Sequence, residues 1–339
     1  MGLPESSQLS FTPDLTICRV LNGMWQVSGA HGRIDPVRAI ESMERYADAG
    51  FTTWDLADHY GPAEDLIGEF RRRIATERGE DALAQTQAFT KWVPRPGPMT
   101  RSIVEENIDI SRRRMGVDCL DLLQFHWWDY GDDRYLDALQ HLTDLKAAGK
   151  IKHLALTNFD TEHLAIICDR AIPIVSNQVQ FSLVDRRPLE RMAAFCQERG
   201  IHLLAYGTLG GGLLSERYLG QPEPGRWALG TASLQKYKRM VDTWGGWQLF
   251  QELLTVLRAI AQRHQVSIAN VAVRYVLDQP AVAGAIVGVR LGLSEHLEET
   301  ARVFSFALSP EDLDAIEAVV GRSHNLYQRI GDCGDEYRR

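Results

Sequence analysis

A short pattern that recurs along the chain limits its possible folds more than any other feature of the sequence. An amphipathic helical stretch ends at a glycine, which can adopt the left-handed conformation that closes a helix, and a short apolar run follows. The pattern leads from ERYADAG into FTTWD, from DLKAAGK into IKHLALTN and from CQERG into IHLLAY. The sequence therefore predicts alternating helices and strands.

Eight apolar runs are suited to buried strands. They cover residues 17–23, 51–55, 87–91, 119–126, 151–158, 174–180, 201–206 and 283–288. Helical patterns lie at residues 36–49, 63–77, 100–115, 134–148, 161–170, 188–199, 247–279 in two pieces and 294–304. A helical crossover returns each strand in the same direction, so the strands should pair in parallel. Eight such units favour an α/β fold of the (β/α)8 TIM-barrel type over its rival, an open doubly wound sheet.

The length of 339 residues suits one barrel domain over residues 1–339. Ser309 and Pro310 mark the start of an extra helix at the C-terminal end. After the seventh predicted strand, residues 207–246 are rich in glycine and proline, so we expect a long loop there. This loop is either a lid with basic groups or a solvated insertion.

Composition and charge exclude several classes of protein. A net charge of -8 argues against a nucleic-acid-binding or membrane-surface protein, because both need a basic surface. The first residues lack the pattern of a secretion signal, and no apolar run is long enough to span a bilayer. Five widely spaced cysteines without a C-x-x-C motif fit reduced thiols. We expect a cytoplasmic protein that acts on a small molecule.

Polar side chains stand at the C-terminal ends of the predicted strands. They are Asp55, Lys91, His126, Asn158, Gln178, Gln180 and Tyr206. In a (β/α)8 barrel these ends meet at one rim, where the functional site is built. Asp55 alone is as well explained by a turn or a helix cap, but six strand ends in register indicate one shared site.

The chemistry of these groups concerns a proton. Lys91 lies among aromatic and aliphatic neighbours and needs a carboxylate partner, for which Asp55 is the candidate. A buried pair of this kind beside Tyr60 would lower the pKa of the phenol toward working pH, and the phenol could then exchange a proton with a carbonyl or alcohol oxygen. His126 could add a hydrogen bond to the same oxygen. No G-x-S-x-G nucleophile is present, so the pattern suggests hydride transfer by a cofactor.

At these residues the chain resembles the aldo-keto reductases. DLADHYG at 55–61 is similar to the D-x-A-x-x-Y-G motif of that family, and Lys91 and His126 fall where the other members of its catalytic tetrad follow. LALTNF, SNQVQFSL, AYGTLGGGLL, IVGVR and HLEET resemble the family's cofactor-binding segments in the same order. The resemblance covers residues 18–320.

The resemblance implies a nicotinamide cofactor that lies extended across the barrel mouth, in agreement with the lack of a G-x-G-x-x-G motif after a strand. It implies that Tyr60 is the general acid in reduction, that Asp55 and Lys91 tune it and that His126 orients the carbonyl. It further implies that Asn158 and Gln178 hold the carboxamide and that Tyr206 stacks on the nicotinamide ring. The full set of implied cofactor-binding residues is Gly23, Met24, Trp25, Thr157, Asn158, Gln178, Tyr206, Gly207, Thr208, Leu209, Gly210, Gly288, Val289, Arg290, His296, Glu299 and Thr300.

Some of these residues depart from the family pattern. Met24 stands where Thr is frequent, and Gly207 and Thr208 replace a Ser-Pro pair whose proline would fix the turn. Thr300 replaces the usual Asn. Arg290 matches an arginine that lies near the adenosine 2'-phosphate in many relatives, so we expect NADPH as cofactor, with NADH possible.

Tryptophans near the strand ends suggest a pocket for the substrate. Trp at such a position lines an apolar pocket or belongs to the core. The pocket is favoured for Trp25 and Trp127, and the core for Trp92 and Trp128. The predicted substrate-binding residues are Trp25, Tyr60, Trp92, His126 and Trp127.

Three other functions were weighed against a carbonyl reductase. His126 and Asp129 could ligate a metal, but the sequence contains neither H-x-H nor H-E-x-x-H, so no metal is expected. A non-catalytic, cofactor-sensing module is one alternative, because the potassium-channel β subunits resemble the same family. The other is an NAD-dependent dehydrogenase that oxidises a sugar or an alcohol with the same tetrad.

Overall fold

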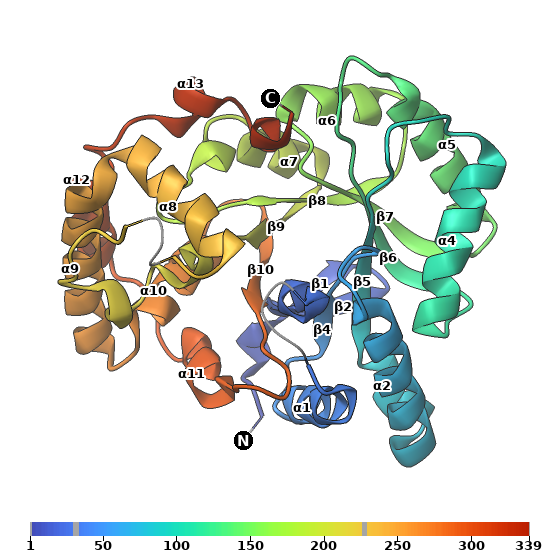
Figure 1. The fold of residues 1–339 in the computed structure, drawn as a ribbon, viewed down its shortest axis with the longest axis horizontal. Coiled ribbons are helices and arrows are strands. Elements are labelled where there is room, and N and C mark those ends of the chain that lie inside the picture. The colour runs from blue at the N-terminus through green and yellow to red at the C-terminus, as the bar shows by residue number, and fades with distance from the viewer. Residues whose placement is uncertain (1, 30–33, 226–228, 339) are drawn as a thin grey trace.

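A closed barrel of eight parallel strands forms the centre of the protein (Figure 1). The computed structural model describes residues 2–29, 34–225 and 229–338. The barrel strands are β3 (Val20–Gly23), β4 (Thr53–Asp55), β5 (Gln87–Trp92), β6 (Leu120–Phe125), β7 (Ile151–Thr157), β8 (Ile174–Gln180), β9 (His202–Tyr206) and β10 (Val282–Gly288). They pair in sequence order, and β10 closes the ring against β3. The predicted (β/α)8 barrel is confirmed, and the rival open sheet is wrong.

Helices surround the barrel. The longer ones are α1 (Pro36–Asp48), α2 (Ala63–Arg78), α4 (Arg101–Met115), α5 (Arg134–Ala147), α6 (Thr161–Asp169), α7 (Met192–Arg199), α9 (Gly246–His264), α10 (Ile268–Leu277) and α12 (Pro310–Val320). Short helices are α3 (Glu80–Ala84), α11 (Leu297–Ala301) and α13 (Leu326–Ile330). The extra C-terminal helix begins where the sequence predicts it, because the Ser309 side chain accepts a hydrogen bond from the N–H of Asp312 and the Asp312 side chain bonds back in a capping box.

The first predicted strand, residues 17–23, is divided in the structure. β2 (Leu15–Cys18) pairs with β1 (Gln8–Thr12) in an antiparallel hairpin, and β3 enters the barrel only after Arg19. The Arg19 guanidinium donates hydrogen bonds to the backbone oxygens of Leu277, Val282 and Ala283. These three bonds fix the bend between the hairpin and the barrel. The apolar pattern of residues 17–23 does not indicate this bend.

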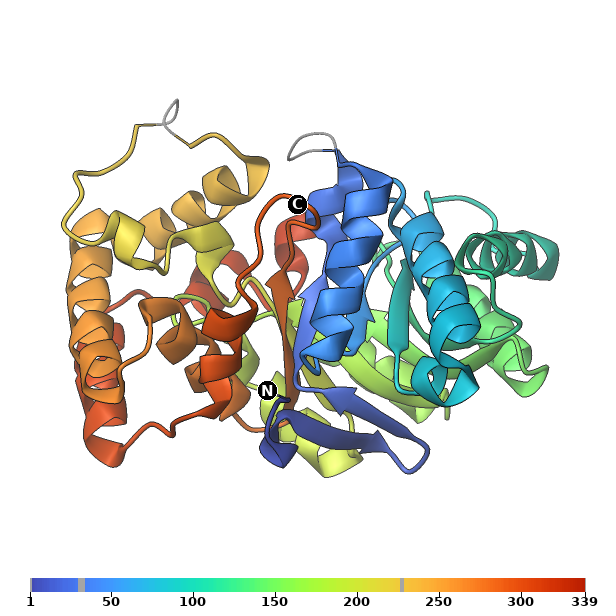
Figure 2. The same ribbon diagram turned by 90° about the horizontal axis from the view of Figure 1, so that it is seen from below.

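The hairpin covers the amino end of the barrel. Phe11 and Ile17 pack in one buried cluster with Phe89 and other inward-facing strand residues, and the ring centroids of Phe11 and Phe89 are 5.9 Å apart. His202 Nε2, at the start of β9, donates to the Phe11 carbonyl oxygen at 3.0 Å. Figure 2 shows the hairpin in dark blue at one end of the molecule and the C-terminus at the other. Only the end of the barrel where the strands terminate is therefore available for a site.

The segment after β9, predicted as a long loop, contains ordered elements. Besides the short 3-10 turns at Gly210–Gly212 and Glu216–Tyr218, it contains α8 (Ala232–Trp244), a helix of 13 residues. The Thr231 side chain caps α8, and Met240, Val241 and Trp244 bury one face of it. Residues 226–228 of the segment lie outside the described residues. The predicted long connection after this strand is present, and it contains a helix because one apolar stripe is enough to dock α8.

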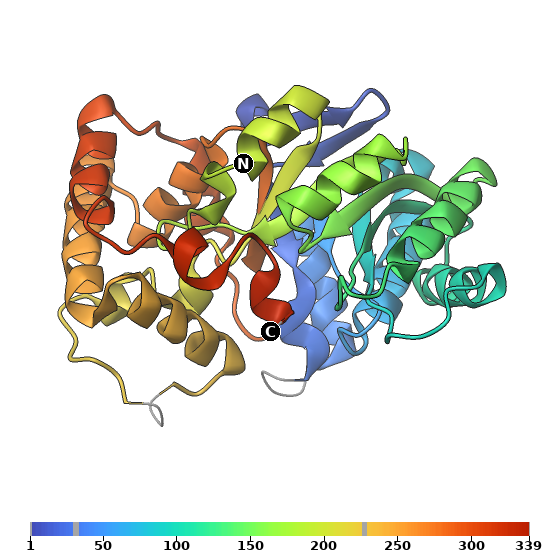
Figure 3. The same cartoon turned by 90° about the horizontal axis from the view of Figure 1, so that it is seen from above.

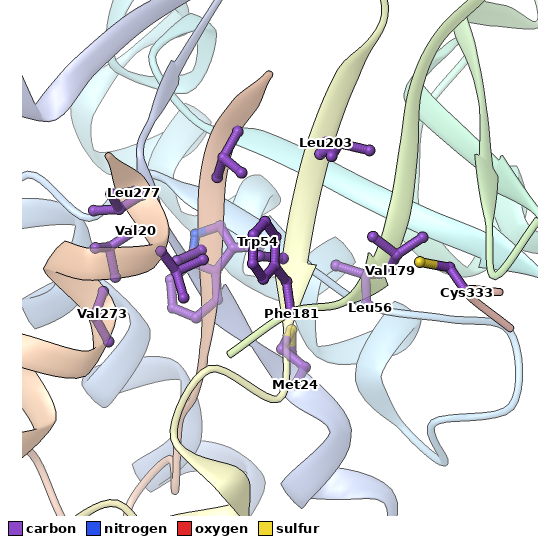
Figure 4. Close-up of a cluster of buried hydrophobic side chains, with 14 of the residues drawn as sticks. Val20, Met24, Trp54, Leu56, Val179, Phe181, Leu203, Val273, Leu277 and Cys333 are labelled. Carbon is purple, nitrogen blue, oxygen red and sulfur yellow. The ribbon is translucent and has the colours of Figure 1, made fainter. Parts of the chain in front are cut away.

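A large apolar core fills the space between the barrel and the helices. Trp54 and Met24 are completely buried in it, with Phe181 and Leu203 nearby (Figure 4). Cys333 brings the C-terminal segment into the same cluster, and all five cysteines are free thiols. No helix within residues 2–29, 34–225 and 229–338 combines the length and apolarity that a bilayer crossing requires.

Candidate active site

A buried carboxylate organises the end of the barrel. Asp55 Oδ2 accepts from Lys91 Nζ at 2.6 Å, and Lys91 also donates to the carbonyl oxygen of Leu56 at 3.0 Å. Asp55 Oδ1 accepts from the side-chain amides of Gln124 at 3.0 Å and Gln178 at 2.7 Å. Both charged side chains are 4% exposed, so the ion pair is held in a low dielectric environment with its bonds satisfied. The predicted partnership of Asp55 and Lys91 is confirmed.

Tyr60 lies beside this pair on the loop after β4. Its ring centroid is 5.1 Å from Lys91 Nζ and 5.0 Å from the indole of Trp25. Burial raises the pKa of Tyr60 well above its usual value, and the Asp55 carboxylate adds to this increase. The expectation that the ion pair would lower the pKa of the phenol is therefore wrong for this form of the protein. Desolvation is the largest cause of the raised pKa, and the phenol keeps its proton at neutral pH.

His126 follows β6 and has one nitrogen fixed by the backbone. Its Nδ1 lies 3.2 Å from the carbonyl oxygen of Thr157, which can only accept, so Nδ1 carries the proton. Burial, followed by the charge of Arg338, lowers the pKa of His126 to about 4, so the ring is neutral at pH 7. Nε2 is then a hydrogen-bond acceptor, and it is buried without a partner. A buried orphan acceptor of this kind indicates a place for a ligand hydrogen.

The residues predicted to hold the nicotinamide bind one another here. The Tyr206 hydroxyl donates to Asn158 Oδ1 at 2.8 Å, and Asn158 adopts a left-handed backbone with φ of 59°. Gln178 Nε2 donates to Gln124 Oε1 at 2.6 Å in addition to its bond with Asp55. Gln124 was not identified from the sequence, although a glutamine inside the apolar run CLDLLQFH was a visible signal.

The C-terminal segment also reaches the site, which the sequence did not reveal. The Tyr337 hydroxyl lies 3.0 Å from that of Tyr206, and the ring centroids of Tyr337 and His126 are 6.2 Å apart. Arg338 donates to the Trp127 carbonyl oxygen at 2.8 Å. Figure 3 shows this segment, in red, running from the α12 side to the middle of the molecule. The residues in these contacts are more than a hundred positions apart in the chain, so no local sequence pattern indicates them.

Buried ion pairs hold the segment in place. Arg187, which is 1% exposed at its side chain, binds Asp185 at 2.8 Å and Glu336 at 2.9 Å. A Cβ added to Gly334, which has φ of 90°, would lie 2.0 Å from the carbonyl oxygen of Asn158. Only glycine therefore allows the segment to approach Asn158 this closely. Gln180 helps to hold Asp185, because its side-chain amide donates a hydrogen bond to the Asp185 carboxylate at 2.7 Å.

The tryptophans divide differently from the prediction. Trp25 is 38% exposed at the mouth, as expected for a pocket wall. Trp127 and Trp92 are both buried in the core, and Trp127 Nε1 donates to the backbone oxygens of Asp129 and Asp132, so neither ring is exposed at the mouth in this structure. Trp128, assigned to the core, is 39% exposed and lies edge-on to the His126 ring at 4.4 Å.

Several positions in the predicted cofactor segments fit a dinucleotide. Gly23 and Gly288 are register partners on β3 and β10, and a Cβ on Gly288 would meet the Gln26 side chain at 2.8 Å. Gly207 has φ of 72° and packs on Tyr237. The Thr208 hydroxyl is buried without a partner. A close backbone approach and an orphan hydroxyl suit a bound phosphate or sugar.

Other predicted cofactor residues are engaged within the protein. The side chain of Met24 is buried in the core, and Val289 is buried as well. The Thr157 hydroxyl donates to the Gln178 carbonyl oxygen at 3.2 Å. Leu209 is half-buried against the core, whereas Gly210 begins a short 3-10 turn at the rim.

The far end of the predicted cofactor path is open and charged. A cavity of about 770 Å³ lies between α10 and α11, and it is lined by His296, Glu299 and other polar side chains, among them Ser267. His296 Nδ1 lies 3.4 Å from the Glu299 carboxylate. Arg290 is exposed on the loop after β10 and does not line this cavity, and neither does Thr300. Of the predicted cofactor-binding residues in this region, His296 and Glu299 line the cavity, and Arg290 and Thr300 do not.

Comparison with known proteins identifies the family. The model of the Aldo/keto reductase family matches residues 19–320. The chain belongs to this family.

Named relatives are distant in sequence. The chain is 25% identical over 329 residues to L-glyceraldehyde 3-phosphate reductase of Escherichia coli O157:H7, with 91% of each chain covered. It is 29% identical over 298 residues to flagellar radial spoke protein 5 of Chlamydomonas reinhardtii, covering 70% of this chain and 56% of that protein's length. An NADH-specific methylglyoxal reductase of Escherichia coli K12 is 22% identical over 324 residues, covering 89% and 94%.

Solved structures agree in fold. The glycerol dehydrogenase AKR11B4 of Gluconobacter oxydans matches with a TM-score of 0.77 at 22% identity, covering 97% and 98% of the two chains. An aldo/keto reductase of Klebsiella pneumoniae in complex with NADP and acetate matches with a TM-score of 0.69 at 19% identity, covering 93% and 95%. At these identities the likeness shows a shared barrel fold alone.

Proposed function

We propose that the protein is a nicotinamide-dependent oxidoreductase that interconverts a small carbonyl compound and its alcohol. The buried Asp55–Lys91 pair beside Tyr60 carries this proposal, because it places an ammonium 5.1 Å from the phenol ring, and His126 adds a buried nitrogen without a partner. A reduced nicotinamide, when bound, supplies the hydride that goes to the carbonyl carbon. The protein then has to manage one proton at the carbonyl oxygen.

Tyr60 is the proposed general acid. Burial raises its pKa, so the phenol is protonated at neutral pH and can donate its hydrogen to the substrate oxygen as negative charge develops there. Lys91, 5.1 Å from the ring centroid, would stabilise the phenolate that remains. Asp55 holds Lys91 in place through the bond of 2.6 Å.

His126 has a different proposed role from the one that the resemblance implies. With its proton on Nδ1, the neutral ring offers a lone pair at Nε2 and cannot donate to a carbonyl oxygen. It can accept from the hydroxyl of the alcohol product, or from a hydroxyl group next to the carbonyl. This supports hydroxylated small molecules as substrates, in line with relatives named for glyceraldehyde 3-phosphate and glycerol.

The same acceptor supports a second candidate, namely oxidation of an alcohol. In a compound with two neighbouring hydroxyl groups, one O–H can donate to His126 Nε2 while the other donates to a Tyr60 phenolate and loses its proton there. The raised pKa of Tyr60 means that this phenolate forms only at alkaline pH in the cofactor-free protein. Reduction is therefore the favoured direction near neutral pH.

NADPH remains the proposed cofactor, with NADH as the alternative. Arg290 is exposed after β10 and offers a guanidinium for a 2'-phosphate. The relatives support both choices, since one is named as NADH-specific and another was solved with NADP. Asn158 Oδ1 already accepts from the Tyr206 hydroxyl, and its second lone pair could accept from the carboxamide.

The test is a Tyr60→Phe variant, with Tyr275→Phe as a control for the loss of a buried hydroxyl outside the site. Nucleotide binding is measured by tryptophan fluorescence, and turnover with a panel of aldehydes, ketones and hydroxylated carbonyl compounds. We expect Tyr60→Phe to lose at least about 100-fold in turnover and to bind the nucleotide within a few-fold of wild type. Wild-type turnover in Tyr60→Phe would refute the assignment. Tight nucleotide binding without turnover of any compound by the wild type would favour the cofactor-sensing module.

A further inference from the structure

Lys236 is surrounded by three tyrosine rings at the mouth of the barrel. Its Nζ lies 5.2 Å from the ring centroid of Tyr206, 5.3 Å from that of Tyr237 and 4.7 Å from that of Tyr337. Lys236 and Tyr237 come from α8, whereas Tyr206 ends β9 and Tyr337 belongs to the C-terminal segment. Three separate parts of the chain therefore build an aromatic cage around one ammonium group.

The hydrogen bonds of the cage run in one direction. Asn158 Oδ1 can only accept, so Tyr206 donates to it, Tyr337 donates to Tyr206, and Lys236 donates to Tyr337. The chain of donors begins at a positive charge and ends at Asn158. The cage thus holds the ammonium close to the tyrosine ring that is proposed to stack on the nicotinamide.

Lys236 keeps its charge in this environment. Burial opposes the charge, but Tyr237, Tyr337 and Glu336 outweigh that effect and raise the pKa of the ammonium. Among the residues that the structure describes, no carboxylate lies within ion-pair distance of Lys236. Glu336, the carboxylate with the largest influence on it, is bound to Arg187 at 2.9 Å. The ammonium is therefore not neutralised by a dedicated partner.

We propose that Lys236 sets the preference of the protein for the reduced over the oxidised form of its nicotinamide cofactor. This inference rests on the proposed function, together with the stacking of the nicotinamide ring on Tyr206 that the resemblance to the aldo-keto reductases implies. The oxidised ring is a cation and the reduced ring is neutral, so an ammonium behind Tyr206 repels only the oxidised form. Nothing else in the two forms of the nucleotide differs in charge.

The distances give the expected effect of Lys236 on the ratio of the affinities for the reduced and the oxidised nucleotide. A ring stacked about 3.5 Å from Tyr206 lies about 8.7 Å from Lys236 Nζ if the two are on opposite faces of the tyrosine, because the ammonium is 5.2 Å from the ring centroid. At an effective dielectric constant of about 20, two unit charges at that separation change an equilibrium roughly 25-fold. A ratio of this size is measurable by titration. The ratio would be larger if the nicotinamide and the ammonium lay on the same face of the Tyr206 ring, because the two charges would then be closer.

The experiment measures the dissociation constants of the reduced and oxidised nucleotide for the full-length protein by tryptophan fluorescence. We expect wild type to bind the reduced form at least about tenfold more tightly, and Lys236→Met to lower this ratio about tenfold or more. Lys236→Arg, which keeps the charge, should retain the ratio. Tyr337→Phe, which keeps both the ring and the ammonium, should also retain it.

Lys238→Met is the matched control. Lys238 lies on the same helix but is bound to Glu223 and Asp242, so its removal should leave the ratio unchanged. If Lys236→Met weakens both forms equally, or changes neither, the ratio stays at the wild-type value and the inference is overturned. If the wild type binds neither form at millimolar concentration, the proposed function fails, and the inference falls with it.

Discussion

The two ends of the predicted cofactor path are built in opposite ways. At the catalytic end, the side chains of Asp55 and Lys91 project from barrel strands, are 4% exposed, and bind each other and neighbouring protein groups. At the far end, the side chains of His296 and Glu299 lie around the short helix α11 and are 65% and 50% exposed. Buried strands fix the chemistry, whereas exposed loops leave room for variation in which nucleotide is bound.

The largest expected effect comes from breaking the buried pair. Lys91→Met leaves the Asp55 carboxylate buried without its cation, which costs about 3–5 kcal/mol of stability in comparable cases. We expect this loss in urea unfolding at pH 7, together with a loss of turnover. The double variant Asp55→Leu with Lys91→Met removes both charges, so it should recover part of the stability and none of the turnover. Equal stability of the single and double variants would contradict this account of the catalytic end.

The second effect is a pH dependence of stability at the same end. Because the folded state lowers the pKa of His126 to about 4 from an ordinary value of 6.5, the unfolded chain binds more protons between these pH values. Stability contributed by the neutral ring is complete above pH 6.5 and is lost as the pH falls toward 4, by up to about 3 kcal/mol. Urea unfolding at several pH values should show that the free energy of unfolding changes less steeply with pH in His126→Gln than in the wild type. An identical slope would mean that other groups control it.

The third effect concerns the segment that crosses the mouth. Gly334 and Gly29 have nearly the same backbone, with φ of 90° and 88°, but a Cβ on Gly29 meets nothing within 4 Å. Gly29→Ala should therefore show only the conformational cost, about 1 kcal/mol. Gly334→Ala should cost more, because its Cβ meets the Asn158 carbonyl oxygen, and should speed proteolysis near the C-terminal end. Equal losses of thermal stability would show that this close approach is unimportant.

The smallest effect is expected at the exposed end. If Arg290 meets a 2'-phosphate, Arg290→Ala should weaken NADPH about tenfold and leave NADH unchanged, since only NADPH carries that group. NADH binding to the same variant is the internal control. Fluorescence titration of both nucleotides decides the matter. Equal weakening of both would assign Arg290 to some other part of the nucleotide.

The barrel and the central ion pair could be predicted because each leaves a local trace. The helix–glycine–strand pattern repeats along the chain, and a lysine in the apolar run QAFTK requires a carboxylate. The direction of the Tyr60 pKa could not be predicted, because a sequence names the neighbours of a group but not how far water is excluded from it.

The exposure of Trp128 differs from that of Trp127, and the spacing of these residues from His126 carries a signal for it. His126 faces the mouth, and residues two apart point to the same side of an extended chain, so Trp128 rather than Trp127 was the better candidate for the pocket. The positions of Tyr337 and Arg338 had no such signal. They depend on buried contacts of Arg187 with Glu336, two residues 149 positions apart in the chain.

The hairpin at the amino end has a practical consequence for anyone handling the protein. Residues attached ahead of β1 would project from the side of the molecule that the hairpin covers, at the amino end of the barrel, so an affinity handle or a surface anchor placed there leaves the other end of the barrel free (Figure 2). The same handle placed after Arg338 would emerge next to His126 and Trp127. Purification strategy alone could then change the kinetics that are measured.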